Sequence, residues 1–462
     1  MKKIFIFMLA ILMATLSAGA YDFSVDGLCY NKNNDGTTVT VTYERNNGGA
    51  NYTSLIGALE IPATVSNEGI TYSVTAIGES AFIYNRTITS VTIPSSVTSI
   101  ASGAFFNCNN LTSVIIPNSV TSIGNTAFYN CGELTSITIP ASVTSIGNDA
   151  FVNCSGVTAI SVDGGNSKYD SRDNCNAIIE TVTNTLIFGC RNTTIPNTVT
   201  SIGVNAFANC WGLISVSIPS SVTSIGDGAF NGCYNMTSVT IPNSVTEIGG
   251  YAFKGCTKLA SINIPRSVTS IGSNAFYECS GLTSVDVPNL TFLGESAFFN
   301  CLNLASANIG SMLPAIAPYA FSGCSSLAEI TIPNTATSIG QGAFWGCTNM
   351  TSVTIGSSVA SIEQLSFASC NNLKSIHSKI QNPKNVTYEP YIFEGVSMNY
   401  CKVYVPVGTL ESYQFTSPWN SFMTILEEGG GQTPVRGDVD GDGVVTSNDV
   451  TIIYNILLGK EE

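Results

Sequence analysis

Residues 116–138 read IPNSVTSIGNTAFYNCGELTSIT, and residues 241–263 repeat the pattern as IPNSVTEIGGYAFKGCTKLASIN. The same 23-residue period can be followed along residues 81–373, and an Ala-Phe pair marks nearly every copy. A fixed period of this length is the sequence signature of a solenoid, in which each repeat forms one coil and neighbouring coils stack. The sequence therefore predicts a β-rich repeat solenoid of about 12 coils.

The apolar residues within one coil show why the coils must stack. In the coil at residues 134–154, apolar side chains alternate with Thr and Ser along the first strand and recur at the turns, which predicts eight inward side chains. Burying them gains roughly 12–24 kcal/mol, whereas ordering a 23-residue repeat costs about 1–2 kcal/mol per residue, so a lone coil is unstable. The inward set is Leu134, Ile137, Ile139, Val143, Ile146, Ala150, Phe151 and Cys154.

Most of the cysteines follow the repeat. Stacked residues in one slot have parallel Cβ vectors about 5 Å apart, beyond the roughly 3.5–4.5 Å that a disulfide requires. We interpret the slot cysteines as small buried hydrophobes; metal binding, the alternative, lacks paired Cys or His at ligand spacing. They are Cys108, Cys131, Cys154, Cys210, Cys233, Cys256, Cys279, Cys301, Cys324, Cys347 and Cys370.

One insert, at residues 163–194, interrupts the period with chain that is charged where the repeats are not. Two apolar runs at residues 177–180 and 185–188 flank a short polar segment, which predicts a hairpin projecting from the solenoid. In-register pairing would bring Cys175 opposite Cys190, so these two residues form a possible disulfide. The insert is either part of a binding face or a tolerated loop elaboration.

The N-terminal residues 1–20 are typical of a secretory signal peptide. Lys2-Lys3 precede an apolar run and a small-residue stretch, and we expect cleavage after Ala20. The apolar residues of the rest of the chain are spread at repeat spacing, which predicts no transmembrane segment in the mature chain. The sequence therefore predicts a secreted or cell-surface protein.

The remaining segments are assigned by composition. The two ends of a solenoid expose apolar side chains and unpaired strand edges, so each end needs a cap. We predict a β-rich cap at residues 21–75, the solenoid at 76–373, an irregular cap at 374–428, a glycine-rich linker at 429–436 and a tail at 437–462.

The tail contains an EF-hand-like loop. Aspartates at loop positions 1, 3, 5 and 12, with glycine at position 6, place hard oxygen ligands around a tight turn, the geometry that calcium prefers. A following helix begins near Val450. A solvated acidic loop is the alternative. The predicted calcium ligands are Asp438, Asp440, Asp442, the carbonyl of Val444, and Asp449.

Three quoted stretches carry a family resemblance over residues 21–428. The repeat IPNSVTSIGNTAFYNCGELTSITIP, the insert YDSRDNCNAIIETVTNTLIFGC and the end segment VYVPVGTLESYQFTSPWNSF resemble the BspA-like leucine-rich repeats of bacterial surface proteins. This resemblance implies a right-handed leucine-rich-repeat solenoid that is exported and used in adhesion or in recognition of host proteins, other cells or glycans.

The tail carries a second resemblance. GDVDGDGVVTSNDVTIIYNILLG is similar to one calcium-binding repeat of a type I dockerin, with Ser447 and Asn448 at the positions used there for recognition of a partner. A full dockerin has two such repeats, and this sequence contains one. Binding to a cohesin and another anchoring role therefore both stay open.

Composition disfavours several functions. The formal net charge of −14 disfavours nucleic acid as a partner. The single histidine, His377, stands in the degraded end of the array without a nucleophile motif or a phosphate-binding glycine loop nearby. We therefore predict that the protein is not an enzyme and uses no organic cofactor.

The outward positions of the predicted strands are mostly Ser and Thr. They favour an adhesin that binds host or bacterial surface proteins through this polar strand face. The alternative is an accessory glycan-binding component of an extracellular polysaccharide-capturing assembly, docked through the tail. Glycan sites usually need exposed aromatic platforms, and the strand face offers few. The predicted strand-face residues are Thr138, Ser217, Thr240, Asn263, Asp286, Thr331 and Thr354.

Overall fold

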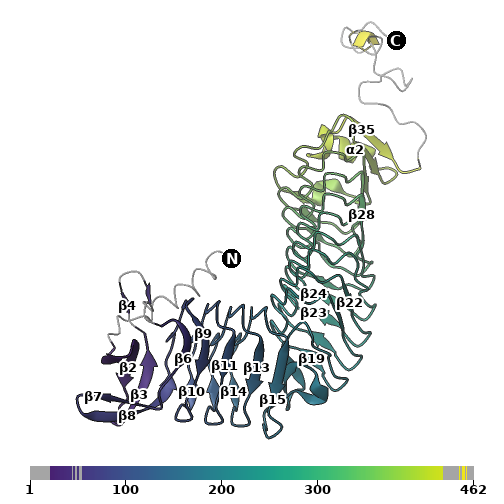
Figure 1. Ribbon diagram of the computed structural model, residues 1–462. Coiled ribbons are helices and arrows are strands. Elements are labelled where there is room, and N and C mark those ends of the chain that lie inside the picture. Colours follow the sequence, from purple (N-terminus) through teal and green to yellow (C-terminus); the bar gives the residue numbers. More distant parts are fainter. Residues whose placement is uncertain are drawn as a thin grey trace. The chain divides into compact units, whose positions relative to one another are not determined.

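Most repeats contribute one short strand to each of two series of parallel strands (Figure 1). A turn containing the Ala-Phe pair closes the coil. The computed structural model describes residues 21–43 and 55–429, the backbone of residues 45–46 and 49–50, and residues 447, 450–452 and 454. The predicted signal peptide and the predicted calcium ligands lie outside these residues. The chain forms two compact units, Met1–Pro196 with Asn205–Gly212, and Asn197–Val204 with Leu213–Glu462.

The first unit begins with the predicted β-rich cap. Antiparallel pairing joins its first three strands, and the third pairs in parallel with a strand that continues into the second sheet of the coils. Phe23 packs on Tyr30 and Tyr72, with ring centroids 5.4 and 5.7 Å apart. The cap strands are β1 (Phe23–Val25), β2 (Leu28–Lys32), β3 (Thr38–Thr42), β4 (Arg45–Asn46), β5 (Gly49–Ala50), β7 (Thr64–Asn67) and β8 (Ile70–Ile77).

The coils of the first unit keep the predicted 23-residue register. Ser90 pairs with Ser113 and Ser136 with Ala159 in the first sheet, while Ser99 pairs with Ser122 in the second. The first-sheet strands are β6 (Gly57–Glu60), β9 (Ile88–Thr92), β11 (Ser113–Ile115), β13 (Ser136–Ile139) and β15 (Ala159–Val162). The second-sheet strands are β10 (Ser99–Ile100), β12 (Ser122–Ile123) and β14 (Ser145–Ile146).

The second unit repeats the same plan. Its first-sheet strands are β20 (Ser215–Ser217), β22 (Ser238–Thr240), β25 (Ser284–Asp286), β27 (Ser306–Asn308), β28 (Glu329–Thr331), β30 (Ser352–Ile355), β32 (Ser375–Ser378), β34 (Lys402–Val405) and β35 (Thr424–Glu427). Its second-sheet strands are β19 (Ser201–Ile202), β21 (Ser224–Ile225), β23 (Glu247–Ile248), β24 (Ser270–Ile271), β26 (Phe292–Leu293), β29 (Ser338–Ile339), β31 (Ser361–Ile362) and β33 (Thr387–Tyr388). The predicted solenoid is confirmed.

The end of the second unit, predicted as an irregular cap, combines the continued first-sheet strands β34 and β35 with irregular segments. Trp419 is fully buried against Tyr413 and Phe393, and its Nε1 donates a hydrogen bond to the Tyr388 hydroxyl at 2.7 Å. This aromatic cluster covers the apolar interior of the last coils. Its segments include α2 (Leu410–Gln414) and the short 3-10 helices η2 (Pro383–Asn385) and η3 (Trp419–Ser421). No helix among the described residues has the length and apolar character needed to cross a membrane.

The inward side chains form a continuous core within each unit. Of the eight inward residues predicted for the coil at residues 134–154, seven are buried. Ile146 is only half-buried, because β14 ends its sheet and the insert takes the place of the next strand. The hydroxyl of Tyr169, from the insert, accepts a hydrogen bond from the Ile146 amide at 3.0 Å. Ile146 packs against the core, as its predicted inward position requires, but its burial is incomplete.

The phenylalanines of the Ala-Phe pairs stack along the solenoid. Phe105 and Phe128 lie 5.1 Å apart between ring centroids, and Phe276 and Phe298 lie 5.2 Å apart, with nearly parallel planes. Each ring is fully buried. One ring in each coil therefore packs between the rings of the coils before and after it, so that the core depends on the stack.

The slot cysteines are buried, as predicted, and they also have a polar role. The Cys108 thiol donates to the carbonyl of Phe82 at 3.0 Å, and the Cys279 thiol donates to the carbonyl of Phe253 at 3.0 Å. In both cases the carbonyl belongs to the preceding coil. The slot therefore satisfies a buried carbonyl with a donor that has almost the volume of an apolar side chain.

We expect these thiols to be unreactive in the folded protein. Burial raises the pKa of Cys108 and of Cys279 to about 12, and the thiolate is the reactive form. Iodoacetamide at about pH 8 should leave the slot cysteines unmodified in native protein and label all fifteen cysteines in concentrated guanidinium. Intact mass spectrometry counts the labels. A Ser358→Cys variant, at an exposed position, is the positive control. Rapid labelling of native slot cysteines would contradict the interpretation.

The residue before each slot cysteine has a left-handed backbone. Its φ is 57° at Asn130, 73° at Gly255 and 58° at Glu278. Glycine adopts this conformation without cost, and asparagine tolerates it better than most residues. The frequent Asn and Gly at this position therefore follow from the turn, and they do not indicate a binding motif.

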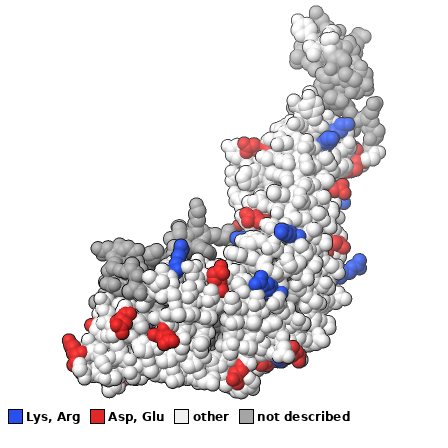
Figure 2. Space-filling view, in the orientation of Figure 1, with Lys and Arg blue, Asp and Glu red and all other residues white. Residues whose placement is uncertain are grey.

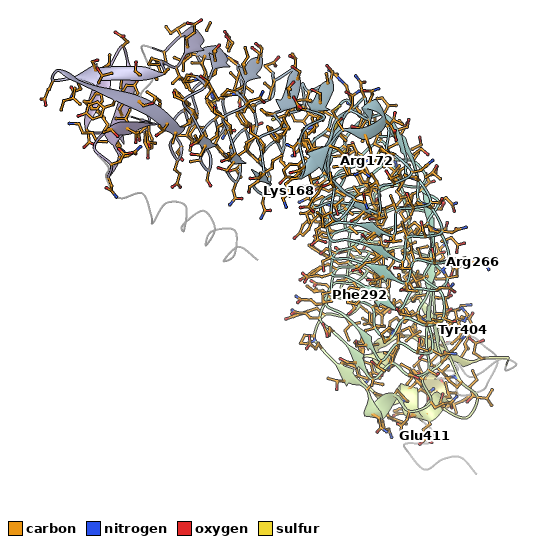
Figure 3. All side chains as sticks on the ribbon, turned by 90° about the horizontal axis from the view of Figure 1, so that it is seen from below. Lys168, Arg172, Arg266, Phe292, Tyr404 and Glu411 are labelled. Carbon is orange, nitrogen blue, oxygen red and sulfur yellow. The ribbon has the colours of Figure 1, made fainter. Side chains whose placement is uncertain are left out.

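The insert contains an antiparallel hairpin formed by β17 (Ala177–Glu180) and β18 (Thr185–Gly189), with β16 (Tyr169–Asp170) and the 3-10 helix η1 (Arg172–Asn174) before it. The Arg172 guanidinium forms a salt bridge with the Asp170 carboxylate at 2.7 Å and donates a hydrogen bond to Asn184 Oδ1 at 2.9 Å. These contacts fix η1 against the hairpin turn. Figure 3 labels Arg172 with its neighbour in the insert, Lys168.

The possible disulfide between Cys175 and Cys190 is not formed. Ala177 pairs with Gly189, so the register directs Asn176, rather than Cys175, toward Cys190. The register shifts by one residue between Ile178 and Ile179, and a hairpin without this irregularity would have paired Cys175 with Cys190. Both cysteines are buried free thiols, and the Cys190 thiol donates to the Asn176 carbonyl at 3.7 Å.

Candidate functional site

The outward residues of the first-sheet strands form the strand face of the second unit. On β25, Ser284 and Asp286 are exposed on either side of buried Val285. On β28, Glu329 and Thr331 are exposed on either side of buried Ile330. This alternation is the ordinary consequence of the strand pleat, and it arranges polar side chains in two rows that run across the strands.

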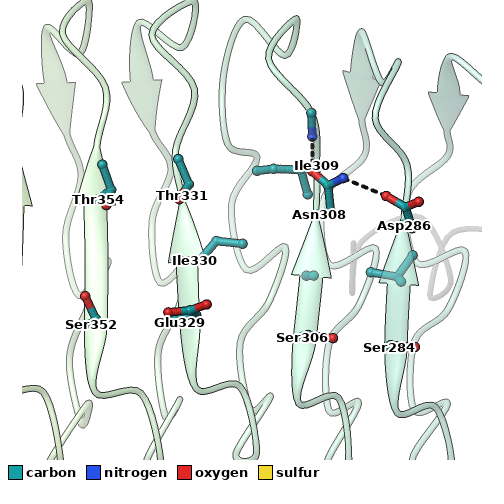
Figure 4. A pocket seen from close by; sticks show the side chains of 13 residues that line it. Ser284, Asp286, Ser306, Asn308, Ile309, Glu329, Ile330, Thr331, Ser352 and Thr354 are labelled. Atoms are coloured by element: carbon teal, nitrogen blue, oxygen red, sulfur yellow. Dashed lines mark hydrogen bonds between the residues drawn. The ribbon is translucent and has the colours of Figure 1, made fainter.

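A hollow of about 530 Å³ opens in this strand face (Figure 4). It spans β25, β27, β28 and β30. Among the described strands, β27 pairs only with β25, and β28 pairs only with β30. The hollow therefore lies across an interruption of the hydrogen-bonded ladder. Its lining residues are Ser284, Val285, Asp286, Ser306, Ala307, Asn308, Ile309, Gly310, Glu329, Ile330, Thr331, Ser352 and Thr354.

The local sequence departs from the repeat at the interruption. Ala307 stands where the neighbouring strands have a larger inward residue, such as Val285 or Ile330. After β27, Gly310 takes the place of the proline that follows most first strands, and a Cβ at this position would lie 2.0 Å from the Pro288 carbonyl oxygen. Glycine thus lets the coil of β27 lie close to the preceding coil. The following strand begins a new sheet.

The polar groups of the hollow are oriented by one another. The Asn308 side-chain amide donates to Asp286 Oδ1 at 2.6 Å, and Asn308 Oδ1 accepts from the Gly310 amide at 3.1 Å. Figure 4 shows these two bonds and places Glu329 on the next strand. None of the lining residues is Lys, Arg or His. The hollow thus combines two carboxylates with hydroxyl and amide groups and lacks a compensating cation.

Charged side chains are sparse in the chain as a whole. Only 10% of its residues are charged, and Figure 2 shows that most of the visible surface carries neither acidic nor basic side chains. Two carboxylates in one hollow therefore stand out among mostly uncharged residues.

The strand face continues beyond the hollow to the single histidine. Thr354 pairs with His377 and His377 with Tyr404 across β30, β32 and β34. The imidazole stacks on the Tyr404 ring at 4.6 Å between centroids, and its Nδ1 lies 2.8 Å from a carboxylate oxygen of Glu428. The histidine is thus engaged by its neighbours on the surface of the sheet, with no nucleophile among the contacts described here.

The hollow gathers three of the predicted strand-face residues, Asp286, Thr331 and Thr354. Thr354 is half-buried, and Asp286 and Thr331 are exposed. Thr138, on the first unit, is exposed and bonds to the Ser161 hydroxyl at 3.2 Å. The predicted residues Ser217, Thr240 and Asn263 are exposed on the second unit, but they do not line the hollow.

Sequence reasoning missed two polar residues of the hollow that carry its chemistry. Asn308 occupies the slot of Asp286 in the next coil, and Glu329 occupies a slot that is Ser in neighbouring coils. Comparison of each slot down the repeats would have shown both substitutions. The ladder interruption that opens the hollow has no comparable signal.

The predicted tail site falls mostly on residues that the structure does not describe. Asp438, Asp440, Asp442, Val444, Asn448 and Asp449 are among them. Ser447 is helical and exposed, and its carbonyl accepts a hydrogen bond from Thr451 at 2.8 Å. Val450 and Tyr454 are 63% and 60% exposed. Within the described part of the chain, no three His, Cys, Asp or Glu side chains are grouped to hold a metal ion.

Comparison with known proteins gives one family and a set of related folds. A family profile described as "BspA type Leucine rich repeat region (6 copies)" matches residues 75–186, 186–305 and 291–420. No curated protein sequence matches the chain.

Two solved structures are similar over most of their length. A leucine rich cell surface protein from Faecalibacterium prausnitzii is 29% identical, with a TM-score of 0.52, and the match covers 78% of this chain and 96% of that protein. A leucine-rich repeat protein from Bacteroides ovatus is 25% identical, with a TM-score of 0.57, over 88% of this chain and 100% of that protein.

Proposed function

We propose that this chain, which belongs to the BspA-type leucine-rich repeat family, is a non-enzymatic recognition protein of the cell surface or the extracellular space that binds partner proteins through the strand face of its second unit. The observation that carries the proposal is the polar hollow at residues 284–354, which is lined by carboxylate, amide and hydroxyl side chains from neighbouring strands. The similar protein from Faecalibacterium prausnitzii is described as a cell surface protein, which supports the location.

The lining of the hollow favours a protein partner over a glycan. Sugar rings usually stack on exposed aromatic side chains, and no aromatic residue lines the hollow. Its hydroxyl, amide and carboxylate groups are suited to hydrogen bonds with side chains and backbone of a partner protein. Host or bacterial surface proteins are therefore the proposed partners, and a glycan-capturing role is the alternative.

The tail is proposed to anchor or dock the protein with bound calcium. Asp438, Asp440, Asp442, Asp449 and the Val444 carbonyl would supply oxygen ligands of the kind that calcium takes. Export by an N-terminal signal peptide would bring the loop into a calcium-containing medium. The exposed apolar residues Val450 and Tyr454 support a role for the following helix in contact with a partner.

A blocking substitution tests the strand-face proposal. Thr331→Arg places a long side chain in the hollow and should weaken binding of a protein partner at least roughly tenfold, because it excludes the groups that the hollow receives. Ser358→Arg, exposed outside the hollow, is the matched control and should change binding less than about twofold.

Surface plasmon resonance against parallel panels of host matrix proteins, bacterial surface proteins and polysaccharides provides the measurement. Protein binding that Thr331→Arg reduces and Ser358→Arg preserves supports the proposal. Binding confined to polysaccharides would favour the glycan alternative, and protein binding insensitive to Thr331→Arg would exclude the hollow as the site.

A further inference from the structure

We infer that the hollow between β25 and β30 recognises basic side chains, arginine above all, on an exposed segment of the partner protein. The inference rests on the proposed function, because it names the chemistry that the strand face would select. It depends on the arrangement of Asp286, Asn308 and Glu329 and on the hollow that they line.

The two carboxylates occupy different parts of one hollow. Asp286 is carried by β25 and Glu329 by β28, with β27 between them, so they are two coils apart and roughly 10 Å or more from each other at the usual strand spacing. Both residues are exposed. The hollow can therefore present negative charge to two neighbouring groups of a ligand, or to both ends of an extended one.

Asn308 orients the carboxylate of Asp286, which favours binding of a planar cation. Its amide fixes Asp286 through Oδ1, while its own Oδ1 is held by the Gly310 amide. A carboxylate whose orientation is fixed loses less side-chain entropy when a ligand binds. The guanidinium group of arginine presents a rigid set of donors that matches a carboxylate, whereas lysine offers a point charge.

The rest of the lining selects against other ligands. The absence of Lys, Arg and His from the lining leaves no positive charge to attract an anionic group. The hydroxyls of Ser306, Thr331 and Ser352 suit the polar backbone of an exposed segment and offer no large apolar surface. A basic, extended peptide segment fits both the charge and the polarity.

The hollow lies where the ladder is interrupted. On either side of the interruption, the Ile332 amide donates to the Thr354 carbonyl at 2.8 Å and the Val287 amide to the Asn308 carbonyl at 2.8 Å. Between β27 and β28 the strands are not paired, and the buried side chains of Ile309 and Ile330 form the floor of the hollow. A ligand group can therefore lie on this floor between the two rows of polar groups.

The test uses a dye-labelled peptide, Gly-Arg-Gly-Arg-Gly with blocked ends, and its counterpart with citrulline in place of arginine. Fluorescence anisotropy with the full chain at low salt measures binding of each. Citrulline keeps the shape of arginine and removes its charge. The arginine peptide should bind at least roughly tenfold more tightly than the citrulline peptide, because the ligand's charge is recognised.

Paired variants locate that binding. The double substitution Asp286→Asn with Glu329→Gln should weaken binding of the arginine peptide at least roughly tenfold. Glu133→Gln with Glu278→Gln removes the same charge from exposed positions outside the hollow and should change affinity less than about twofold. Circular dichroism melting checks that both pairs keep the native fold.

The outcomes of these experiments distinguish the basic-group inference from the proposed function. Equal weakening by the two pairs would show binding by the overall negative charge and would overturn the inference, as would equal affinity for the citrulline peptide. If partner-protein binding is lost in Thr331→Arg but kept in Asp286→Asn with Glu329→Gln, the proposed function stands and the basic-group inference fails. If the arginine peptide behaves as expected while Thr331→Arg leaves protein partners bound, the basic site stands and the proposed function fails.

Discussion

Deletion of residues 241–263 should leave a folded, shorter solenoid, whereas deletion of residues 241–251 should destroy the fold of the second unit. The longer deletion joins Thr240 to Ile264, which stands in the same slot as the Ile241 that it replaces. Thr240 already lies beside Asn263 in a parallel bridge, so the coils on either side of the deletion have matching surfaces. Each repeat position in one coil therefore still stacks on the same repeat position of the coil that becomes its neighbour.

The shorter deletion breaks that correspondence. It removes β23 from between β21 and β24 and deletes Val245 and Ile248, both fully buried. Loss of two such side chains alone costs about 4–10 kcal/mol, which approaches the whole stability of a typical domain. Circular dichroism melting distinguishes the two variants. Similar cooperative melting of both would contradict the dependence of the fold on the period.

The full chain should bind one calcium ion, and Asp440→Ala with Asp442→Ala should weaken that binding roughly 100-fold or more. The double substitution removes two of the carboxylates proposed as ligands of a cation that requires many oxygen ligands. Unliganded aspartates at alternate positions also repel one another, and the cation removes that repulsion. Isothermal titration calorimetry measures the change.

Two further proteins complete the calcium experiment. A chain ending at Glu428 lacks the loop and should show no calcium binding. Glu133→Ala with Glu278→Ala removes two exposed carboxylates far along the chain from the tail and should bind calcium normally. Calcium binding by the shortened chain equal to that of the full chain would assign the site to the solenoid instead of the tail.

The repeat could be read from the sequence because every coil satisfies the same requirements. Leu134 and Ile137 are inward for the same reason as their equivalents in each coil, and the 23-residue register follows directly. Cys108 shows where this reasoning was incomplete. Its burial was predictable, but its bond to the Phe82 carbonyl depends on the backbone of the preceding coil.

The hollow could not be predicted in the same way. Asp286 was visible as the one acidic residue among outward Ser and Thr positions, but the sequence did not show that Glu329, two coils away, lines the same hollow. Gly310 does not predict the missing pairing between β27 and β28, because Gly356 approaches Pro333 about as closely beside the continuous pairing of β30 with β32. The register of the insert hairpin, which separates Cys175 from Cys190, depends on a local irregularity.

The buried thiols set a kinetic requirement on folding. In the unfolded chain, fifteen cysteines are open to oxidation, and any pair that bridges is held out of its slot. Each slot cysteine is covered once its own coil and the coils next to it have stacked, and these contacts join residues only 22–26 positions apart. Such short-range contacts form early in folding. If the chain is exported as proposed, rapid stacking from coil to coil, rather than a network of bridges, would keep the thiols reduced in an oxidising medium.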